Sequence, residues 1–239
     1  MIVEIWSDVV CPWCYIGKRR FESALADFEH ADEVEIRWRS FELDPNAPLQ
    51  HPGTMAEHQA ARSGSTLEQA AATLAGIDKL AAAEGLTLHL ARTEKANTLD
   101  AHRLVHLGYQ KDTATGAAVK EALFEACFTR LQLVSEPEVL LEAGLRAGLD
   151  HTEITSLLNS DRFTNEVRAD ETQAGALGST GVPFYVFDRA FAVSGAQDPD
   201  TFSTALHRAW ERSQPLLEVV APSATSTSAT VCTDDSCTL

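Results

Sequence analysis

The feature that most constrains this chain is a C-P-W-C motif at residues 11–14, between a short apolar run and a helical pattern. The apolar run, residues 2–6, predicts a strand, and the helical pattern is expected to continue to Ala31. Residues 34–41 then alternate apolar and polar side chains, which predicts a second strand with one buried face. The start of the chain is therefore expected to form a strand–helix–strand unit with two cysteines at the first turn of its helix.

The spacing of the two cysteines is that of a redox site. Free N–H groups and the dipole at a helix start favour negative charge, so Cys11 should form a thiolate more readily than a free cysteine. Cys14 follows one turn later on the same face and can resolve the mixed disulfide that Cys11 forms with a substrate. Pro12 suits the first helical turn. A structural metal site or two ordinary buried cysteines are the alternatives for an isolated C-x-x-C.

Composition narrows the class of protein. The chain has 239 residues and is 44% hydrophobic, which is enough to bury a core. With 19 basic and 35 acidic residues its formal net charge is -16, which disfavours nucleic acid and anionic membranes as partners. No signal-peptide pattern or membrane-spanning run is evident, so we expect a cytoplasmic protein whose five cysteines are reduced, catalytic or metal-binding.

The middle of the chain is expected to be helical. Residues 42–53 are rich in proline and predict an irregular connection, and about six helices are expected between residues 55 and 177. Helix starts are predicted from capping boxes at Ser65 with Glu68 and at Ser135 with Glu138, and from an N-cap at Asn97 for a helix through residues 99–107. Gly85 and Gly148 are predicted to end helices as C-terminal glycines.

The pattern changes back to strands after residue 178. Residues 183–187 and 190–193, joined by a turn at 188–189, predict a hairpin, and Asp198 with Pro199 starts a last helix that reaches about residue 212. Residues 222–239 are mostly Ser, Thr and Ala and are expected to form a mobile tail. The segments are thus 1–50 and 179–215 for the sheet-forming halves, 51–178 for the helices, and 216–239 for the tail.

Four stretches of the chain, residues 7–17, 97–104, 181–184 and 193–197, resemble the thioredoxin superfamily. More closely, the chain is similar to the DsbA-like oxidoreductases of the FrnE group, which are related to 2-hydroxychromene-2-carboxylate isomerases and kappa-class glutathione transferases. The resemblance implies an α/β fold, a thioredoxin fold with a large all-helical insertion between its βαβ and ββα halves.

The resemblance also implies a function and its site. Cys11 would be the nucleophile and Cys14 the resolving thiol of a thiol-disulfide oxidoreductase or isomerase acting on protein or peptide disulfides. Pro183 would be cis beside the Cys11 sulfur, with the backbone of Val182 pairing with substrate and Pro12 and Trp13 bordering the same groove. No metal or cofactor beyond the redox disulfide is implied. A separate thiol partner would recycle the site, and the protein would be a monomer or a homodimer.

The remaining cysteines have several interpretations. Cys232 and Cys237 have the C-x4-C spacing found at the end of some members of the FrnE group, which implies a second redox pair that relays electrons to the first. A solvent-exposed pair with no defined role, or a zinc site joining all four thiols, are the alternatives. Cys127 lies in a helical run among apolar residues and is predicted to be core.

Polar residues of the helical part offer a second kind of binding site. Asn97, His102 and Arg103 match the stretch that lines a substrate or glutathione pocket in the isomerase-like relatives, although each also suits a structural role. Glutathione is therefore a possible co-substrate. A glutathione-dependent isomerase or transferase acting on a small aromatic or polyketide molecule is the main alternative function, and a peptide-binding, chaperone-like module is a third. Because relatives of high oxidising power carry a histidine between the cysteines, Trp13 argues against strong oxidation.

Overall fold

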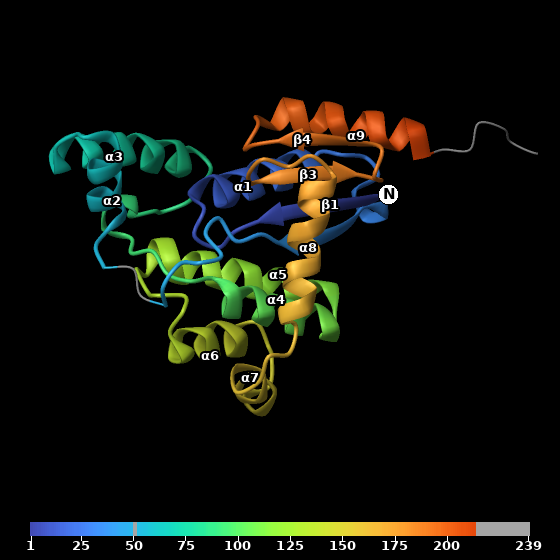
Figure 1. The fold of residues 1–239 in the computed structure, drawn as a ribbon. Coiled ribbons are helices and arrows are strands. Elements are labelled where there is room, and N and C mark those ends of the chain that lie inside the picture. Colours follow the sequence, from blue (N-terminus) through green and yellow to red (C-terminus); the bar gives the residue numbers. More distant parts are fainter. Residues whose placement is uncertain (50–51, 214–239) are drawn as a thin grey trace, which may run out of the picture.

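A four-stranded mixed sheet organises the chain, in a computed structural model that describes residues 1–49 and 52–213. Its strands are β1 (Ile2–Ser7), β2 (Glu35–Ser40), β3 (Phe184–Phe187) and β4 (Phe191–Ser194), in the order β2-β1-β3-β4. β1 pairs parallel with β2 and antiparallel with β3, and β3 pairs antiparallel with β4. Strands from both ends of the sequence thus meet in one sheet, as expected (Figure 1).

Alternating side chains place helices on both faces of this sheet. Val3 and Ile5 of β1 pack with Phe21 and Phe202, which lie on α1 (Pro12–Ala26) and α9 (Pro199–Ser213). Trp6 points to the opposite face, together with Phe184 and Val186, and packs there against α8 (Thr164–Ala176). Figure 1 shows α9 running along one side of the sheet and α8 crossing the other.

The helices between β2 and β3 form the expected helical insertion. Among the described residues there are seven α-helices rather than six: α2 (Met55–Ser63), α3 (Leu67–Ala83), α4 (Leu99–Lys111), α5 (Thr113–Phe124), α6 (Pro137–Arg146), α7 (His151–Leu158) and α8. Short 3-10 turns at Ala31–Glu33 and Leu90–Arg92 and a π-helical turn at Glu125–Thr129 complete the elements. None of the helices in the described part of the chain is long and apolar enough to cross a membrane.

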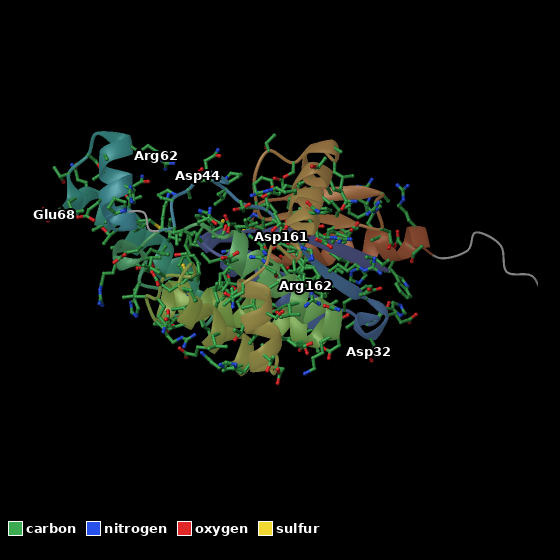
Figure 2. The ribbon with its side chains drawn as sticks, turned by 60° about the horizontal axis from the view of Figure 1, so that its bottom comes forward. Asp32, Asp44, Arg62, Glu68, Asp161 and Arg162 are labelled. Atoms are coloured by element: carbon green, nitrogen blue, oxygen red, sulfur yellow. The ribbon has the colours of Figure 1, made fainter. Side chains whose placement is uncertain are left out.

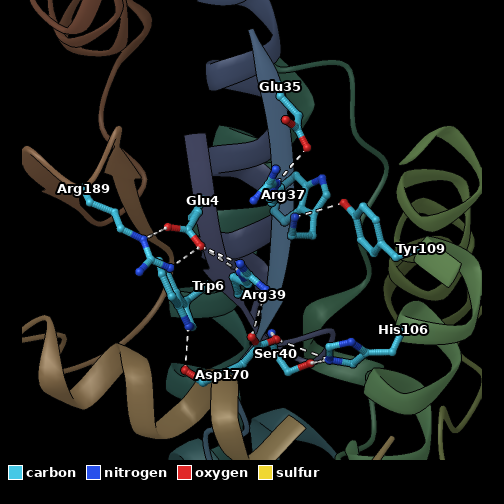
Figure 3. Close-up of polar contacts among 11 residues, drawn as sticks. Glu4, Trp6, Glu35, Arg37, Arg39, Ser40, His106, Tyr109, Asp170 and Arg189 are labelled. Carbon is cyan, nitrogen blue, oxygen red and sulfur yellow. Dashed lines mark hydrogen bonds and ion pairs between the residues drawn. The ribbon is translucent and has the colours of Figure 1, made fainter. Parts of the chain in front are cut away.

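A polar cluster joins α8 to the sheet (Figure 3). Glu4 of β1 is buried and accepts hydrogen bonds from Arg39 and Arg189, which come from β2 and the β3–β4 turn. Asp170 of α8 accepts from Arg39 and from the backbone of β2, and its carbonyl oxygen accepts from Trp6 Nε1 at 2.8 Å. The buried carboxylates are therefore paired, and they fix the angle at which the insertion returns to the sheet.

Several predicted helix ends are shifted. α1 ends at Ala26 rather than Ala31, because the chain turns at Asp27 and forms a separate 3-10 turn before β2. Both capping boxes predicted at serines are wrong. The Ser65 hydroxyl bonds that of Ser63, and the Ser135 hydroxyl donates to the Leu49 carbonyl oxygen.

The N-caps of α3 and α6 each lie one residue after the predicted serine. Thr66 with Gln69 forms the capping box of α3, and Glu136 precedes Pro137 at the start of α6. The Asn97 side chain does accept from the Leu99 N–H, at 3.0 Å, although Thr98 is the N-cap residue. The C-terminal glycines are confirmed, since Gly85 and Gly148 have φ of 75° and 88° directly after α3 and α6.

Candidate active site

The C-P-W-C motif lies at the start of α1, as predicted. Cys11 is the N-cap residue, with φ -98° and ψ 109°, and Pro12 takes the first helical position. The Cys11 N–H donates to the Asp8 carbonyl oxygen at 3.2 Å, and the Cys14 N–H donates to the Cys11 carbonyl oxygen at 3.0 Å. These bonds close the turn and direct both thiols toward the helical insertion, where they belong to one apolar core with its side chains.

The two thiols have different environments. Both are free, and Cys11 is 5% exposed while Cys14 is fully buried. Burial raises the pKa of Cys14 well above its usual value, and the neighbouring Cys11 raises it further. Cys14 therefore stays protonated. The deeper position of Cys14 suits a resolving thiol behind an attacking thiol at the helix start.

The loop before β3 meets the first thiol. The Val182–Pro183 peptide bond is cis, which confirms that expectation, and the Cys11 thiol donates to the Val182 carbonyl oxygen at 3.7 Å. Gly17 of α1 makes room for this loop, because a Cβ there would lie 2.6 Å from Tyr185 Oη and 3.2 Å from Pro183 Cγ. Gly17 lies within a stretch used for the family resemblance, yet nothing in its sequence context indicates this packing role.

A pocket of about 560 Å³ opens beside Cys11. Apolar residues form much of its wall, and charged residues of the insertion and of the loop after β2 also line it, including Arg62 and Asp44 (Figure 2). The lining residues are Asp8, Val10, Cys11, Pro12, Trp13, Leu43, Asp44, Ala47, Met55, His58, Gln59, Arg62, Leu74, Ile77, Lys95, Ala96, Thr98 and Val182. The structure thus brings Pro12, Trp13 and Val182 together with Cys11 in one pocket, and their predicted part in substrate binding stays a prediction.

The other predicted substrate-binding residues have internal contacts. Asn97 donates from its amide to the Ala47 carbonyl oxygen at 3.0 Å, on the loop that forms part of the pocket wall. Arg103 is 4% exposed and donates to backbone carbonyl oxygens at the end of α7 and in the segment after it, and to Asp100. His102 is 1% exposed and points toward the motif rather than into solvent. These contacts hold the insertion in place behind the pocket.

A buried ionisable cluster beneath the motif is a feature that the sequence reasoning missed. His102 Nε2 lies 3.4 Å from Asp8 Oδ1, and the Leu43 N–H donates to the other Asp8 oxygen at 2.8 Å. Burial would raise the pKa of Asp8, but the contact with His102, the Leu43 N–H and the charge of Lys120 together lower it. Burial lowers the pKa of His102. The cluster therefore contains a carboxylate beside a neutral imidazole.

Lys120 of α5 completes this cluster. It is 1% exposed, and its ammonium donates to the Ser7 carbonyl oxygen at 3.2 Å, at the end of β1. Burial lowers the pKa of Lys120 to about 8, although the charges of Cys14 and Asp8 act in the opposite direction. The sequence signal for this buried charge was a lysine among the apolar positions of a helix, because a lysine is almost never fully buried unless it is paired.

Of the three remaining cysteines, the structure describes only Cys127. Cys127 is 1% exposed and burial raises its pKa, so its predicted place in the core is confirmed. Cys232 and Cys237 lie outside the described residues, and their redox role stays a prediction. Within residues 1–49 and 52–213 no group of three or more His, Cys, Asp or Glu side chains is arranged to hold a metal ion.

Comparisons with known proteins agree with this geometry. The sequence pattern of the DSBA-like thioredoxin domain matches residues 2–207. A crystal structure of a probable DsbA oxidoreductase from Streptomyces coelicolor is 43% identical, with a TM-score of 0.85 over 92% of this chain and 94% of that one. The uncharacterized protein YwbO of Bacillus subtilis is 24% identical over 212 residues, which are 85% of this chain and 94% of YwbO. A 2-hydroxychromene-2-carboxylate isomerase shares the fold, with 17% identity and a TM-score of 0.62 over 89% of this chain and 97% of that one.

Proposed function

The chain belongs to the DSBA-like thioredoxin domain family, and from this premise we propose that it is a thiol-disulfide oxidoreductase acting on protein or peptide disulfides. The observation that carries the proposal is the asymmetric thiol pair, in which Cys11 caps a helix beside a pocket and Cys14 is buried one turn behind it. A pair of this kind can accept and return two electrons without a further cofactor.

The exchange follows from the positions of the two sulfurs. The Cys11 thiolate attacks one sulfur of a substrate disulfide, a bond forms between them, and the other substrate sulfur leaves with the electron pair as a thiolate. Cys14 then loses its proton and attacks the Cys11 sulfur. The internal disulfide forms, the second substrate thiolate leaves, and the substrate has gained two electrons that the protein has lost. The same steps in reverse oxidise a substrate dithiol.

The pocket beside Cys11 supports a peptide substrate. Trp13 is 38% exposed and lines the pocket together with Val182, so a bound chain would contact an aromatic face and a main-chain carbonyl group. Main-chain hydrogen bonds bind peptides with little regard to side chains, while apolar pocket walls favour those with a large apolar residue near the cysteine. We therefore infer broad recognition of extended, partly unfolded chains.

Substitution of the thiols tests the proposal. Cys11→Ser is expected to abolish reduction of insulin by dithiothreitol above the uncatalysed rate, because no nucleophile remains. Cys14→Ser should instead accumulate mixed disulfides between Cys11 and substrate, visible by mass spectrometry. Cys127→Ala is the matched control, since it removes a buried thiol outside the motif, and it should keep wild-type turnover. Full turnover in folded Cys11→Ser would exclude the proposed function.

Glutathione is the second candidate substrate, and the size of the pocket favours it. A volume of about 560 Å³ accommodates a tripeptide whose sulfur reaches Cys11. If glutathione is a co-substrate of an isomerase or transferase, its consumption will saturate and turnover will proceed without net thiol oxidation. If it is only a reductant of the internal disulfide, glutathione disulfide will accumulate in step with substrate reduction.

A further inference from the structure

The three cations of α1 that follow the motif, Lys18, Arg19 and Arg20, are already paired with carboxylates. Lys18 Nζ lies 2.5 Å from Glu22 and 2.7 Å from Glu121, and Arg19 binds the same two carboxylates. Arg20 pairs with Glu84 at 2.7 Å. Trp13 occupies the position where strongly oxidising relatives are expected to carry a cation. The thiolate of the reduced site must therefore be stabilised by helix dipoles alone or by a charge from elsewhere in the fold.

Lys120 is a buried cation near the motif, and it comes from the insertion. Among the described residues its ammonium has no carboxylate within ion-pair distance, although its side chain is almost completely buried. An ammonium in such surroundings is costly unless an anion accompanies it. The groups whose negative charge would favour the ammonium most are Cys14, then Asp8, then Cys11.

One peptide group connects this ammonium to the buried thiol. Lys120 Nζ donates to the carbonyl oxygen of Ser7 at 3.2 Å, and the N–H of the same peptide, which belongs to Asp8, acts to lower the pKa of Cys14. A charge on the carbonyl side of an amide polarises it and strengthens its N–H as a donor. The ammonium therefore acts on Cys14 both directly and through the Ser7–Asp8 peptide.

We propose that Lys120 is the positioning cation of the redox site, whose ammonium stabilises thiolate charge in the reduced form and thereby sets the reduction potential. This rests on the proposed function, since it assumes that the pair cycles between dithiol and disulfide. In the reduced form the ammonium balances Asp8 and a thiolate. In the oxidised form the thiolate charge is gone, and of the groups that favour the ammonium only Asp8 and Asp170 remain, with Asp170 the weaker of the two.

The groups that face Lys120 come from four elements. Cys14 belongs to α1, Asp8 and the N-cap residue Cys11 to the loop before it, and Asp170 to α8. His102 of α4 also faces it, and the Lys120 charge contributes to keeping that imidazole neutral. Because His102 is neutral, the charge that changes between redox states is that of the thiols.

A titration of the unmodified chain gives the first test. Following Lys120 Cε and Nζ by NMR, we expect its titration midpoint to be lower by about one pH unit in the disulfide form than in the dithiol form, because oxidation removes a nearby negative charge. Identical midpoints in the two redox states would overturn the proposal. This measurement requires no substitution and no substrate turnover, so it is independent of the test of the proposed function.

Substitution gives the second test. In Lys120→Met the dithiol–disulfide equilibrium with glutathione should shift about tenfold toward the disulfide, which is a potential about 30 mV more negative. The pH profile for alkylation of Cys11 should move upward by about one unit. Lys18→Met is the matched control, because it removes another buried lysine whose charge Glu22 and Glu121 already neutralise, and it should leave both values unchanged.

A double variant separates charge from packing. Asp8→Asn combined with Lys120→Met removes the carboxylate that repels the thiolate, so the equilibrium should return toward the wild-type value. A folded Lys120→Met protein within twofold of the wild-type equilibrium constant would refute the proposal, as would a shift that Asp8→Asn does not reduce. If Lys120→Met fails to fold, Lys120→Arg keeps the charge and should retain the wild-type equilibrium, and the NMR titration still decides.

Discussion

Replacing Gly17 with alanine tests whether close packing of α1 against the Pro183 loop maintains the active site. In an exposed helix interior this change stabilises a protein by up to about 1 kcal/mol. Here the new methyl group would lie 2.6 Å from Tyr185 Oη and 3.2 Å from both Pro183 Cγ and Ala196 Cβ. Overpacking of a rigid core costs about 1–3 kcal/mol, and Tyr185 is fully buried and cannot swing away. We therefore expect a net loss of about 1–2 kcal/mol.

Urea unfolding measured at pH 7 for a set of three variants checks this magnitude. Gly76→Ala on α3 is the matched control, because nothing lies within 4 Å of the added methyl group, and it should raise stability. Tyr185→Phe removes the atom of closest approach, a buried hydroxyl without a hydrogen-bond partner among the described residues. The double variant Gly17→Ala with Tyr185→Phe should recover about 1 kcal/mol of the loss.

The functional consequence follows from the direction of the clash. The methyl group pushes Pro183 and its loop away from α1, and Val182 carries the carbonyl oxygen that contacts the Cys11 thiol. The rate of insulin reduction should fall in Gly17→Ala and recover partly in the double variant. A Gly17→Ala protein as stable as wild type, with full activity, would refute the reasoning that this close approach is required.

Two further predictions concern the insertion. Burial would raise the pKa of Glu121, but Arg19 and Lys18 lower it to about 2. Glu121→Gln should therefore lower the free energy of unfolding in urea by up to about 3 kcal/mol at pH 7, and this difference should vanish as the pH falls from about 4.5 to 2. Glu22→Gln, at a more exposed carboxylate, is the control and should change the free energy of unfolding little. Arg103→Met leaves buried carbonyl oxygens without donors and should lower the free energy of unfolding by about 3 kcal/mol, while kcat/KM per folded molecule stays unchanged. Arg92→Met, at an exposed arginine, is the control. Lost activity at unchanged stability would instead make Arg103 a substrate-binding residue.

The parts of the site that sequence could predict are those whose determinants are local. A strand, a C-x-x-C motif and a helix follow one another within residues 2–26, and their hydrophobic periods and the proline at the first turn identify each one. The place of Pro183 beside Cys11 depends on a contact between residues 171 positions apart, and only the family resemblance indicated it. Helix ends were less predictable, since the hydroxyls of Ser65 and Ser135 found other partners in the folded chain.

Contacts made by the insertion explain why the buried cluster escaped prediction. Lys120 reaches Ser7 across 113 positions, and His102 reaches Asp8 across a similar distance along the chain. In isolation each has a plausible local interpretation, a charged helix surface or a satisfied core histidine. Only the packing of α4 and α5 beneath the motif shows that both act on Asp8, three residues before Cys11.

This arrangement places residues of the helical insertion around the two cysteines. The thioredoxin-like half provides Cys11, Cys14 and the Val182–Pro183 loop, while α2 and α3 form pocket wall and α4 and α5 supply the buried charges. A change in the packing of α5 therefore alters the electrostatics at Cys14 without touching the C-P-W-C motif. Chains with the same motif but a different residue at the position of Lys120 should accordingly differ in reduction potential, because the peptide that contacts Cys14 would lose its cation.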